Sequence, residues 1–369
     1  MADASNYGAG GGTGATSAIR GGVLRALLAA FLFGASAPLA KGLVQDVRPQ
    51  MLAGLLYLGS GVGLLAVWLA QRGRSSAEAP LTRRDVPWLA GAIAAGGVLA
   101  PLLLMIGLSR TSAASASLLL NLEGVLTALI AWFVFHENFD RRIALGMIAI
   151  VAGGAIISWQ GRAELGSFVG PLAIAGACLC WAVDNNLTQK VSAGDPVQVT
   201  MLKGLIAGTV NTALAFTLGG HLPVVWRTIS AMGLGFVSYG LSLVLFVLAL
   251  RSLGTARTGA YFSTAPFVGA ALSFIIWHDQ VTLPLMIGGA CMAAGVWLHV
   301  TEQHVHEHAH ETLEHEHLHV HDEHHQHAHS ANDPPVGAPD EPHSHWHRHE
   351  PLVHTHAHVP DIHHRHGHD

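Results

Sequence analysis

The chain has 369 residues, of which 50% are hydrophobic and 12% are charged, and its formal net charge is −5. Soluble domains carry about 25% charged residues, so this composition excludes an ordinary soluble domain. Three cysteines, all within apolar runs, exclude a secreted disulfide scaffold. The 66 residues from His304 onward hold 23 of the 27 histidines, which separates a histidine-rich tail from an apolar body.

Residues 1–21 are rich in glycine and alanine, so we expect them to be disordered. They lack a basic n-region, so we do not interpret them as a cleaved signal. After them the chain is predicted to cross a membrane ten times, because about 20 residues at 1.5 Å each span the hydrocarbon core. The predicted spans lie near residues 22–44, 50–70, 86–108, 113–135, 141–159, 170–190, 196–218, 230–250, 256–278 and 282–300. The connections are too short to hold a catalytic domain, so we predict that the chain is not an enzyme and that its main partner is the lipid bilayer, with no nucleic acid.

Basic residues at the ends of the predicted spans indicate the orientation. With the N-terminus inside, eleven lysines and arginines flank the cytoplasmic side and five flank the opposite side. The positive-inside rule then places both termini in the cytoplasm. We therefore expect an integral protein of the bacterial inner (plasma) membrane whose tail lies in the cytosol.

An internal repeat links the two halves of the apolar body. Residues 108–155 match residues 250–297 at a constant offset of 142, so that His-Glu-Asn at 136–138 falls on His-Asp-Gln at 278–280. Each half holds five spans, and because five is odd the second half must enter the membrane from the other side, as in the inverted repeats of many secondary transporters. The predicted segments are 1–21, 22–159, 170–300 and a tail at 301–369.

A family resemblance rests on short motifs within these halves. They are an aromatic-Gly-x₆-Lys pattern from Phe33 to Lys41, Glu137 at the end of the fourth span, Asp279 after the ninth, and Pro266 within the ninth. With them the apolar body resembles the EamA-type ten-helix transporters of the drug/metabolite transporter superfamily. The resemblance implies an all-α polytopic membrane protein that moves amino acids or other small metabolites by alternating access, with a substrate cavity between the halves.

One acidic residue departs from that family pattern. Glu123 lies about ten residues into the fourth span, close to the bilayer midplane. An acid at a helix centre costs about 2.5–3.5 kcal/mol on insertion scales, and such residues mark proton or ion paths. Burial favours the neutral carboxyl group, so Glu123 could take up a proton from one side and release it on the other. The alternative is a protonated glutamic acid bonded to a neighbouring helix through Asn121, Thr127 or a backbone carbonyl.

A polar run at residues 184–189 lies in the sixth span, where apolar packing alone would not select it. On a helix Asp184 and Thr188 share a face, and Asn185 lies on the next. These side chains are predicted to line a central site together with the acid of the fourth span. In the alternative, the span ends earlier and leaves Asp184 in interfacial water beside Lys190.

Lys41 and Lys190 lie at span ends, where lysines commonly reach to the membrane surface; contact with substrate is the other interpretation. The predicted substrate or coupling residues are Asn121, Glu123, Asp184, Asn185, Thr188, Lys41 and Lys190. Two Gly-x₃-Gly pairs, at 59–63 and 204–208, permit close helix contact either within the monomer or across a homodimer.

The tail alternates histidine with other residues over long stretches. In an extended chain every second side chain projects the same way, and neutral imidazole suits zinc, nickel, cobalt and copper. We therefore predict several weak metal sites, and because the tail has almost no large apolar residues we expect it to be disordered. An alternative role is a polyanion that responds to pH. The predicted metal ligands are His304, His306, His308, His310, His315, His317, His319, His321, His343, His345, His347, His349, His354, His356 and His358.

Three functions are consistent with this pattern. The first is an exporter of a small metabolite or amino-acid-like solute, with a metal-binding tail unrelated to the substrate. The second is a divalent transition-metal transporter whose tail collects substrate, although the spans lack a cluster of histidine, cysteine and aspartate with ligand spacing. The third is a membrane-tethered metal store or sensor, for which an inverted repeat is more machinery than an anchor needs.

Overall fold

The computed structural model describes residues 12–71, 81–135, 141–159, 168–188, 191, 195–253, 258, 261–300, 304–310, 313–319, 343–349 and 352–358. Of the predicted features, residues 136–138 with Glu137, the polar residues 189–190 and His321 lie outside these ranges. Helix is present from Gly12, so the expected disorder of the N-terminus is wrong for residues 12–21. Once a span has nucleated a helix, each added residue contributes a backbone hydrogen bond at little further cost.

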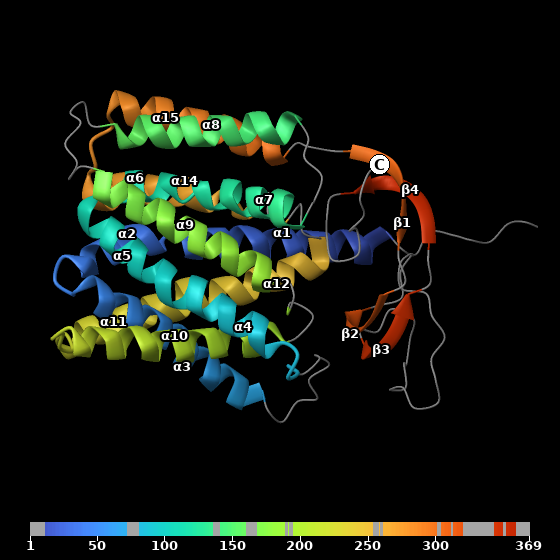
Figure 1. Ribbon diagram of the computed structural model, residues 1–369, viewed down its shortest axis with the longest axis horizontal. Coiled ribbons are helices and arrows are strands. Elements are labelled where there is room, and N and C mark those ends of the chain that lie inside the picture. Colours follow the sequence, from blue (N-terminus) through green and yellow to red (C-terminus); the bar gives the residue numbers. More distant parts are fainter. Residues whose placement is uncertain are drawn as a thin grey trace, which may run out of the picture.

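Helices occupy all ten predicted spans (Figure 1). The first half holds α1 (Gly12–Gly34) with α2 (Ser36–Val44), α3 (Pro49–Gln71), α4 (Val86–Ala92) with π-helix η1 (Ile93–Leu99) and α5 (Ala100–Arg110), α6 (Ala113–Leu119) with α7 (Leu122–Phe135), and α8 (Arg141–Ser158). The second holds α9 (Val169–Thr188), α10 (Pro196–Thr217), α11 (Val225–Gly235) with π-helix η4 (Phe236–Leu241) and α12 (Ser242–Leu253), α14 (Ala265–Trp277), and α15 (Leu283–Val300).

The length and hydropathy of the helices within residues 12–300 identify an all-α polytopic membrane protein. Six stretches of the described chain are long and apolar enough to cross a membrane, and three shorter apolar helices match the fifth, ninth and tenth predicted spans. The sixth span is α9, whose 20 residues suffice for the hydrocarbon core but carry the polar run. The boundaries agree with the predicted spans to within about five residues, apart from the first, where α1 begins at Gly12, and the ninth, where the continuous described helix begins at Ala265.

Helix irregularities recur at matching places in the two halves. A π-helix interrupts the third span at η1 and the eighth at η4. The fourth span breaks between α6 and α7 at residues 120–121, and within one residue of the offset of 142 a turn at 263–264 precedes α14. Shared defects of this kind support the predicted repeat more firmly than matched apolar residues do, because each requires its own local arrangement of hydrogen bonds.

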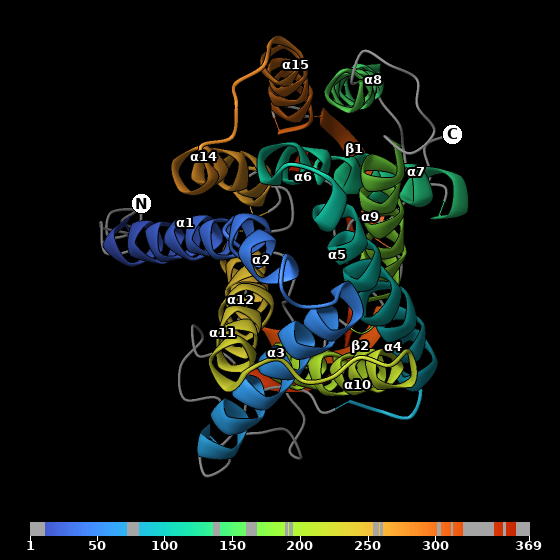
Figure 2. The ribbon, with the colours of Figure 1, turned by 90° about the vertical axis from the view of Figure 1, so that its left-hand side faces the viewer.

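The packing of the helices follows the symmetry between the two halves (Figures 1 and 2). The pairs α3 with α10, α6 with α14, and α8 with α15 each join a span to its equivalent in the other half. The contact of α1 with α12 joins the first and eighth spans, and its equivalent, α5 with α9, joins the third and sixth. This pattern is what two inverted five-helix repeats produce.

Glycine allows the closest of these contacts. A Cβ atom at Gly59 would meet the backbone of Met232 in α11, and one at Gly208 would meet the backbone of Leu58 in α3. The two Gly-x₃-Gly pairs of the sequence therefore serve packing between α3 and its neighbours within one chain. A homodimer stays a prediction that these glycines do not support.

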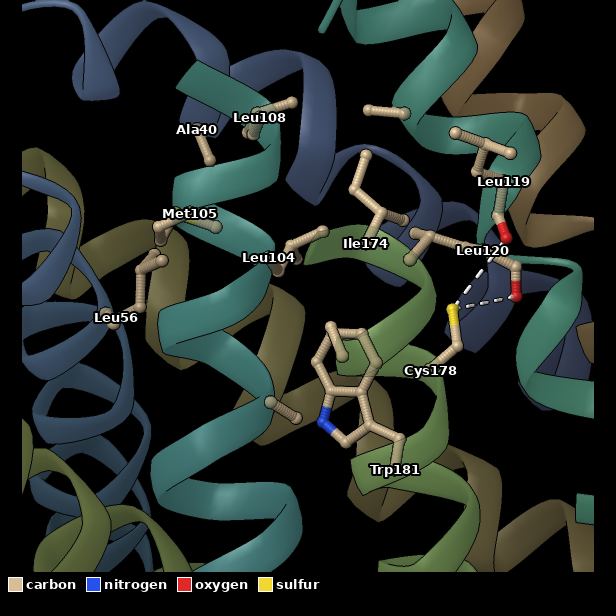
Figure 3. Close-up of a cluster of buried hydrophobic side chains, with 14 of the residues drawn as sticks. Ala40, Leu56, Leu104, Met105, Leu108, Leu119, Leu120, Ile174, Cys178 and Trp181 are labelled. Carbon is tan, nitrogen blue, oxygen red and sulfur yellow. Dashed lines mark hydrogen bonds between the residues drawn. The ribbon is translucent and has the colours of Figure 1, made fainter. Parts of the chain in front are cut away.

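The apolar core lies between α3, α5, α9 and the break in the fourth span (Figure 3). Leu56, Leu104 and Met105 are fully buried there, and Ile174 and Cys178 of α9 pack beside them. This core fixes the position of α9, on which the polar run lies.

Four strands lie beyond α15: β1 (His304–His310), β2 (Leu313–His319), β3 (His343–His349) and β4 (Leu352–His358). The strands form two antiparallel pairs, β1 with β4 and β2 with β3. The expectation of a disordered tail is therefore wrong for these segments. That expectation considered only the missing apolar core, whereas the period-2 alternation of the sequence also suits an extended chain that pairs through backbone hydrogen bonds.

Candidate functional site

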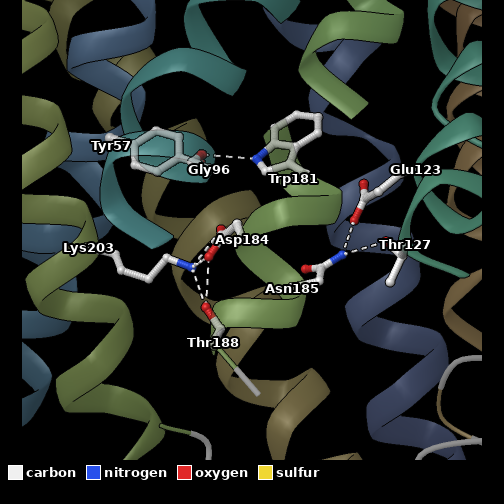
Figure 4. Close-up of polar contacts among 9 residues, drawn as sticks. All are labelled: Tyr57, Gly96, Glu123, Thr127, Trp181, Asp184, Asn185, Thr188 and Lys203. Atoms are coloured by element: carbon white, nitrogen blue, oxygen red, sulfur yellow. Dashed lines mark hydrogen bonds and ion pairs between the residues drawn. The ribbon is translucent and has the colours of Figure 1, made fainter. Parts of the chain in front are cut away.

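The polar run of α9 is divided between two neighbouring helices (Figure 4). Asp184 and Thr188 contact α10 on one side, and Asn185 contacts α7 on the other. Consecutive helical residues point about 100° apart, so a single helix can present adjacent side chains to different partners. The predicted central residues are thus brought close together, but as two separate polar groups.

The first group is a buried ion pair. Lys203 Nζ lies 2.6 Å from Asp184 Oδ1 and 2.7 Å from Oδ2, and both side chains are less than one tenth exposed. The Thr188 hydroxyl donates to Asp184 Oδ1 at 2.7 Å and accepts from Lys203 Nζ at 3.2 Å. Asp184 is therefore buried and paired, in contrast to the alternative that placed it in interfacial water.

Lys203 is the site residue that sequence reasoning missed. It is the one basic residue in the interior of the span at 196–218, eight residues into α10. An ionisable group at that depth requires a partner of opposite charge. That requirement, applied to the acid of the neighbouring sixth span, was the available signal.

A distortion of η1 makes room for this ion pair. A Cβ atom at Gly96 would overlap the carboxylate of Asp184, so only glycine fits. The backbone oxygen of Gly96 accepts from Tyr57 OH at 2.9 Å and from Trp181 Nε1 at 3.1 Å. A π-helical turn displaces the regular bonding pattern, and these two side chains satisfy the displaced carbonyl.

The second group lies at the start of α7, in the middle of the fourth span. Asn185 Nδ2 donates to Glu123 Oε1 at 2.8 Å and approaches Thr127 Oγ1 at 3.4 Å. Glu123 is half-buried in the first turn of α7, and Asn185 is exposed. The helix N-terminus favours a carboxylate through the helix dipole, so the break in the span gives Glu123 a favourable position as an anion, and among the described residues its hydrogen-bond partner is the uncharged amide of Asn185.

The break itself is held by local bonds. Asn121 Nδ2 donates to the Leu118 oxygen at 2.9 Å, and the Cys178 thiol lies 3.7 Å from the Leu119 oxygen (Figure 3). In the second half, Thr264 Oγ1 donates to the Tyr261 oxygen at 2.6 Å beside the equivalent turn. These groups replace helix hydrogen bonds that the interruption removes. The structure thus places Asn121 at the break, two residues from Glu123.

Lys41 lies away from both groups. Its Nζ donates to the backbone oxygens of Leu108 and Thr111 at 2.6 and 2.7 Å, and so caps the last turn of α5. Nearby, Asp279 Oδ2 accepts from the backbone nitrogen of Ala114 at 3.0 Å, at the start of α6. Cations at helix C-termini and anions at N-termini are both favourable, so these side chains join the ends of successive spans.

An aromatic layer lies beside the two polar groups. Phe33 of α1 contacts Trp181, Tyr239 and Phe262 with ring centroids 6.3, 5.9 and 5.4 Å apart, and Tyr57 contacts Tyr239 at 5.5 Å. Trp181 precedes Asn185 by one turn of α9. Edge-to-face and tilted contacts between aromatic rings stabilise packing beyond the burial of their area. Because Phe33 and Tyr57 belong to the first half and the other rings to the second, the layer joins the two halves.

No group of three or more histidine, cysteine or acidic side chains is placed to hold a metal ion among the residues searched, which are those that the structure describes. The side chains of the tail lie outside that description.

The sequences of the two halves decide the family. Residues 20–159, and again residues 168–301, match the EamA-like transporter family. The chain belongs to this family. The named relatives of this EamA-like chain are transporters, so the prediction that it is not an enzyme is confirmed.

Individual relatives of the EamA-like chain are distant. It is similar to an "Uncharacterized transporter" of Methanothermobacter thermautotrophicus, 26% identical over 294 residues, 75% of this chain and 85% of that protein. It is also similar to the probable 4-amino-4-deoxy-L-arabinose-phosphoundecaprenol flippase subunit ArnE of Pseudomonas paraeruginosa, 46% identical over 78 residues, 21% of this chain and 65% of that protein. A solved structure titled "Crystal structure of protein" is 20% identical with a TM-score of 0.56, over 76% of this chain and 95% of that one, and shows the same fold.

Proposed function

We propose that this EamA-like transporter exports a small metabolite or amino-acid-like solute by alternating access, with coupling to protons at Glu123. The observation that carries the proposal is the contrast between two acids of the same membrane interior. Asp184 is neutralised by Lys203, whereas the hydrogen-bond partner of Glu123 in the described chain is the uncharged amide of Asn185. An acid held without a counter-ion exchanges readily between a proton and a cationic group of a solute.

The position of Glu123 supports the same role. It lies at the N-terminus of a half-helix within an interrupted span, beside the layer that joins the two repeats. Secondary transporters bind substrate near the midplane at such interruptions. The partial similarity to a flippase subunit whose named substrate bears an amino group makes amines one class of solute to test.

The orientation and the tail complete the proposal. The protein lies in a bacterial inner membrane with both termini in the cytoplasm, where the tail binds zinc, nickel, cobalt or copper. A divalent-metal transporter fed by the tail is the second candidate, favoured by the start of β1 only four residues after the end of α15. A membrane-tethered metal store or sensor is the third.

Proton movement in proteoliposomes tests the role of Glu123. The full chain is reconstituted with a pH-sensitive dye inside, and a panel of amino acids and primary amines is added outside. Glu123→Gln keeps the shape of the side chain but removes its titration, so solute-dependent proton flux is expected to fall to the level of empty liposomes. Asp46→Asn, which removes a half-exposed acid paired with Arg227, is the matched control and should leave the flux unchanged. Undiminished flux in Glu123→Gln would refute the coupling role.

A further inference from the structure

The two strand pairs of the tail follow one common register. His304 pairs with His358 and His308 with His354 in the first pair, and His315 pairs with His347 in the second. In both pairs a residue further along one strand has a partner equally further back along the other, and the residue numbers of two partners have the same sum in both sheets. The described strands therefore keep one common register, as in an antiparallel hairpin with β1 and β2 on one arm and β3 and β4 on the other.

This register places histidine opposite histidine. Six directly opposed pairs result, three in each sheet: His304 with His358, His306 with His356, His308 with His354, His315 with His347, His317 with His345, and His319 with His343. Directly opposed residues lie on the same face of a sheet, and so do residues two apart along a strand. Each sheet thus has one face made of three consecutive rungs of histidine.

The opposite faces offer little to hold the hairpin together. In the first sheet the register there pairs Val305 with Ala357, Glu307 with Thr355 and Ala309 with Val353, and in the second it pairs Glu314 with Arg348, Glu316 with Trp346 and Leu318 with Ser344. A charge pair such as Glu314 with Arg348 contributes about 0.2–1 kcal/mol, and a lone two-stranded hairpin is marginally stable in water at best. The pairing of the strands therefore needs a further source of stability. The opposed histidines are the side chains in both sheets that could supply it by binding metal ions.

We propose that divalent first-row transition-metal ions clasp the two arms together at these histidine rungs. Opposed Cβ atoms lie about 4.5–5.5 Å apart, a spacing across which two imidazoles can converge on one ion at the Zn–N distance of about 2.0–2.1 Å. A neighbouring rung supplies the remaining nitrogen ligands. Three rungs in each sheet suffice for one such site per sheet, so two tightly held ions per chain are expected.

Metal binding and hairpin formation are then one process. The ligands of either sheet come from arms separated by residues 320–342, so the site does not exist until the arms meet, and the free energy of binding becomes free energy of folding. Because β1 begins four residues after α15 ends, the clasp brings the distal arm back to the end of the tenth span. This inference rests on the metal binding proposed above for the tail and does not depend on the proposed transport of a solute.

Spin labels on the full-length protein in detergent test the clasp. Cysteines replace Glu307 and Thr355, which are register partners in the first sheet and lie off its histidine face, in a background whose three native cysteines are changed to alanine. Zn²⁺ is the probe because its filled d shell is magnetically silent. Strong dipolar broadening is expected with Zn²⁺ and its loss with EDTA. Broadening that EDTA leaves intact, or none with saturating Zn²⁺, would overturn the proposal.

A matched pair of variants separates register from the mere number of histidines. His306→Ala with His356→Ala removes the middle rung of the first sheet and should abolish the broadening and lower tightly bound zinc from two ions to one per chain, measured by elemental analysis after desalting. His324→Ala with His327→Ala removes two tail histidines that lie in sequence between β2 and β3, and should change neither quantity. Equal losses in the two variants would show that the tail binds metal by composition and would reject the clasp.

Discussion

At the scale of single residues, the two acids beside α9 differ in what they require. Asp184 needs Lys203, because removing one partner of a buried ion pair leaves an uncompensated charge in a medium that solvates it poorly. Glu123 makes no such ion pair in the described chain and is held by an amide and a helix N-terminus. The first arrangement is suited to stability, and the second to a group that changes its charge.

The ion pair can be tested by comparing single and double substitutions. Asp184→Asn strands Lys203 and is expected to lower the free energy of unfolding by about 3–5 kcal/mol. Asp184→Leu combined with Lys203→Met removes both charges and should recover most of that loss. Thermal unfolding of the purified chain in detergent reports both effects.

The surface pair of Arg227 and Asp46, 29% and 49% exposed, is the control. Breaking it with Arg227→Met should cost no more than about 1 kcal/mol. If the buried double variant is as unstable as the single one, the pair is not held by charge complementarity.

At the scale of elements, the irregular turns are what shape the site. η1 brings the Gly96 carbonyl to Tyr57 and Trp181 and leaves space for Asp184. The break before α7 puts a helix N-terminus under Glu123. Regular helices in the same spans would give neither the space nor the dipole.

Glycine substitutions test the role of η1. Gly96→Ala places a methyl group into the carboxylate of Asp184, so we expect a loss of about 1–3 kcal/mol of stability, as for other overpacked interiors. Gly233→Ala in α11 meets no atom within 4 Å and should instead stabilise by up to about 1 kcal/mol through helix propensity. Thermal unfolding of the two variants decides; equal behaviour would mean that η1 relaxes freely around the added methyl group.

The sequence predicts the spans well because hydropathy and length decide them. It predicts the interruptions poorly, since residues 120–121 are Leu-Asn, without the proline or glycine that marks most breaks. It places Asp184 and Asn185 on one helix but cannot assign their partners, which depend on how α7 and α10 pack against it. The tail fails differently: strand pairing there depends on residues far apart in the chain, which local composition does not show.

At the scale of the whole molecule, the apolar body and the tail are separable objects. The family match ends at residue 301, and β1 begins at His304. The three functional hypotheses assign transport and metal binding to these parts in different combinations, so removing one part tests them together.

Truncation after Val300 makes that comparison in cells. We expect the truncated chain to keep solute-dependent proton flux while cell-associated zinc and nickel, measured by elemental analysis, fall to the level of cells without the protein. Full-length Glu123→Gln should show the reverse. If Glu123→Gln instead abolishes the change in cellular metal, the spans move metal and the divalent-metal transporter becomes the leading function.

The two-sided bonding of α9 has a mechanical consequence. If α9 rotates as a rigid body, Asp184 and Asn185 move together, because consecutive residues are fixed about 100° apart around the helix axis. Any rotation that releases Asn185 from Glu123 on one flank must also shear the Lys203 contact on the other. A change of charge at Glu123 in α7 is therefore coupled to the contact between α9 and α10. The strength of the buried ion pair sets how much free energy a rotation of α9 requires.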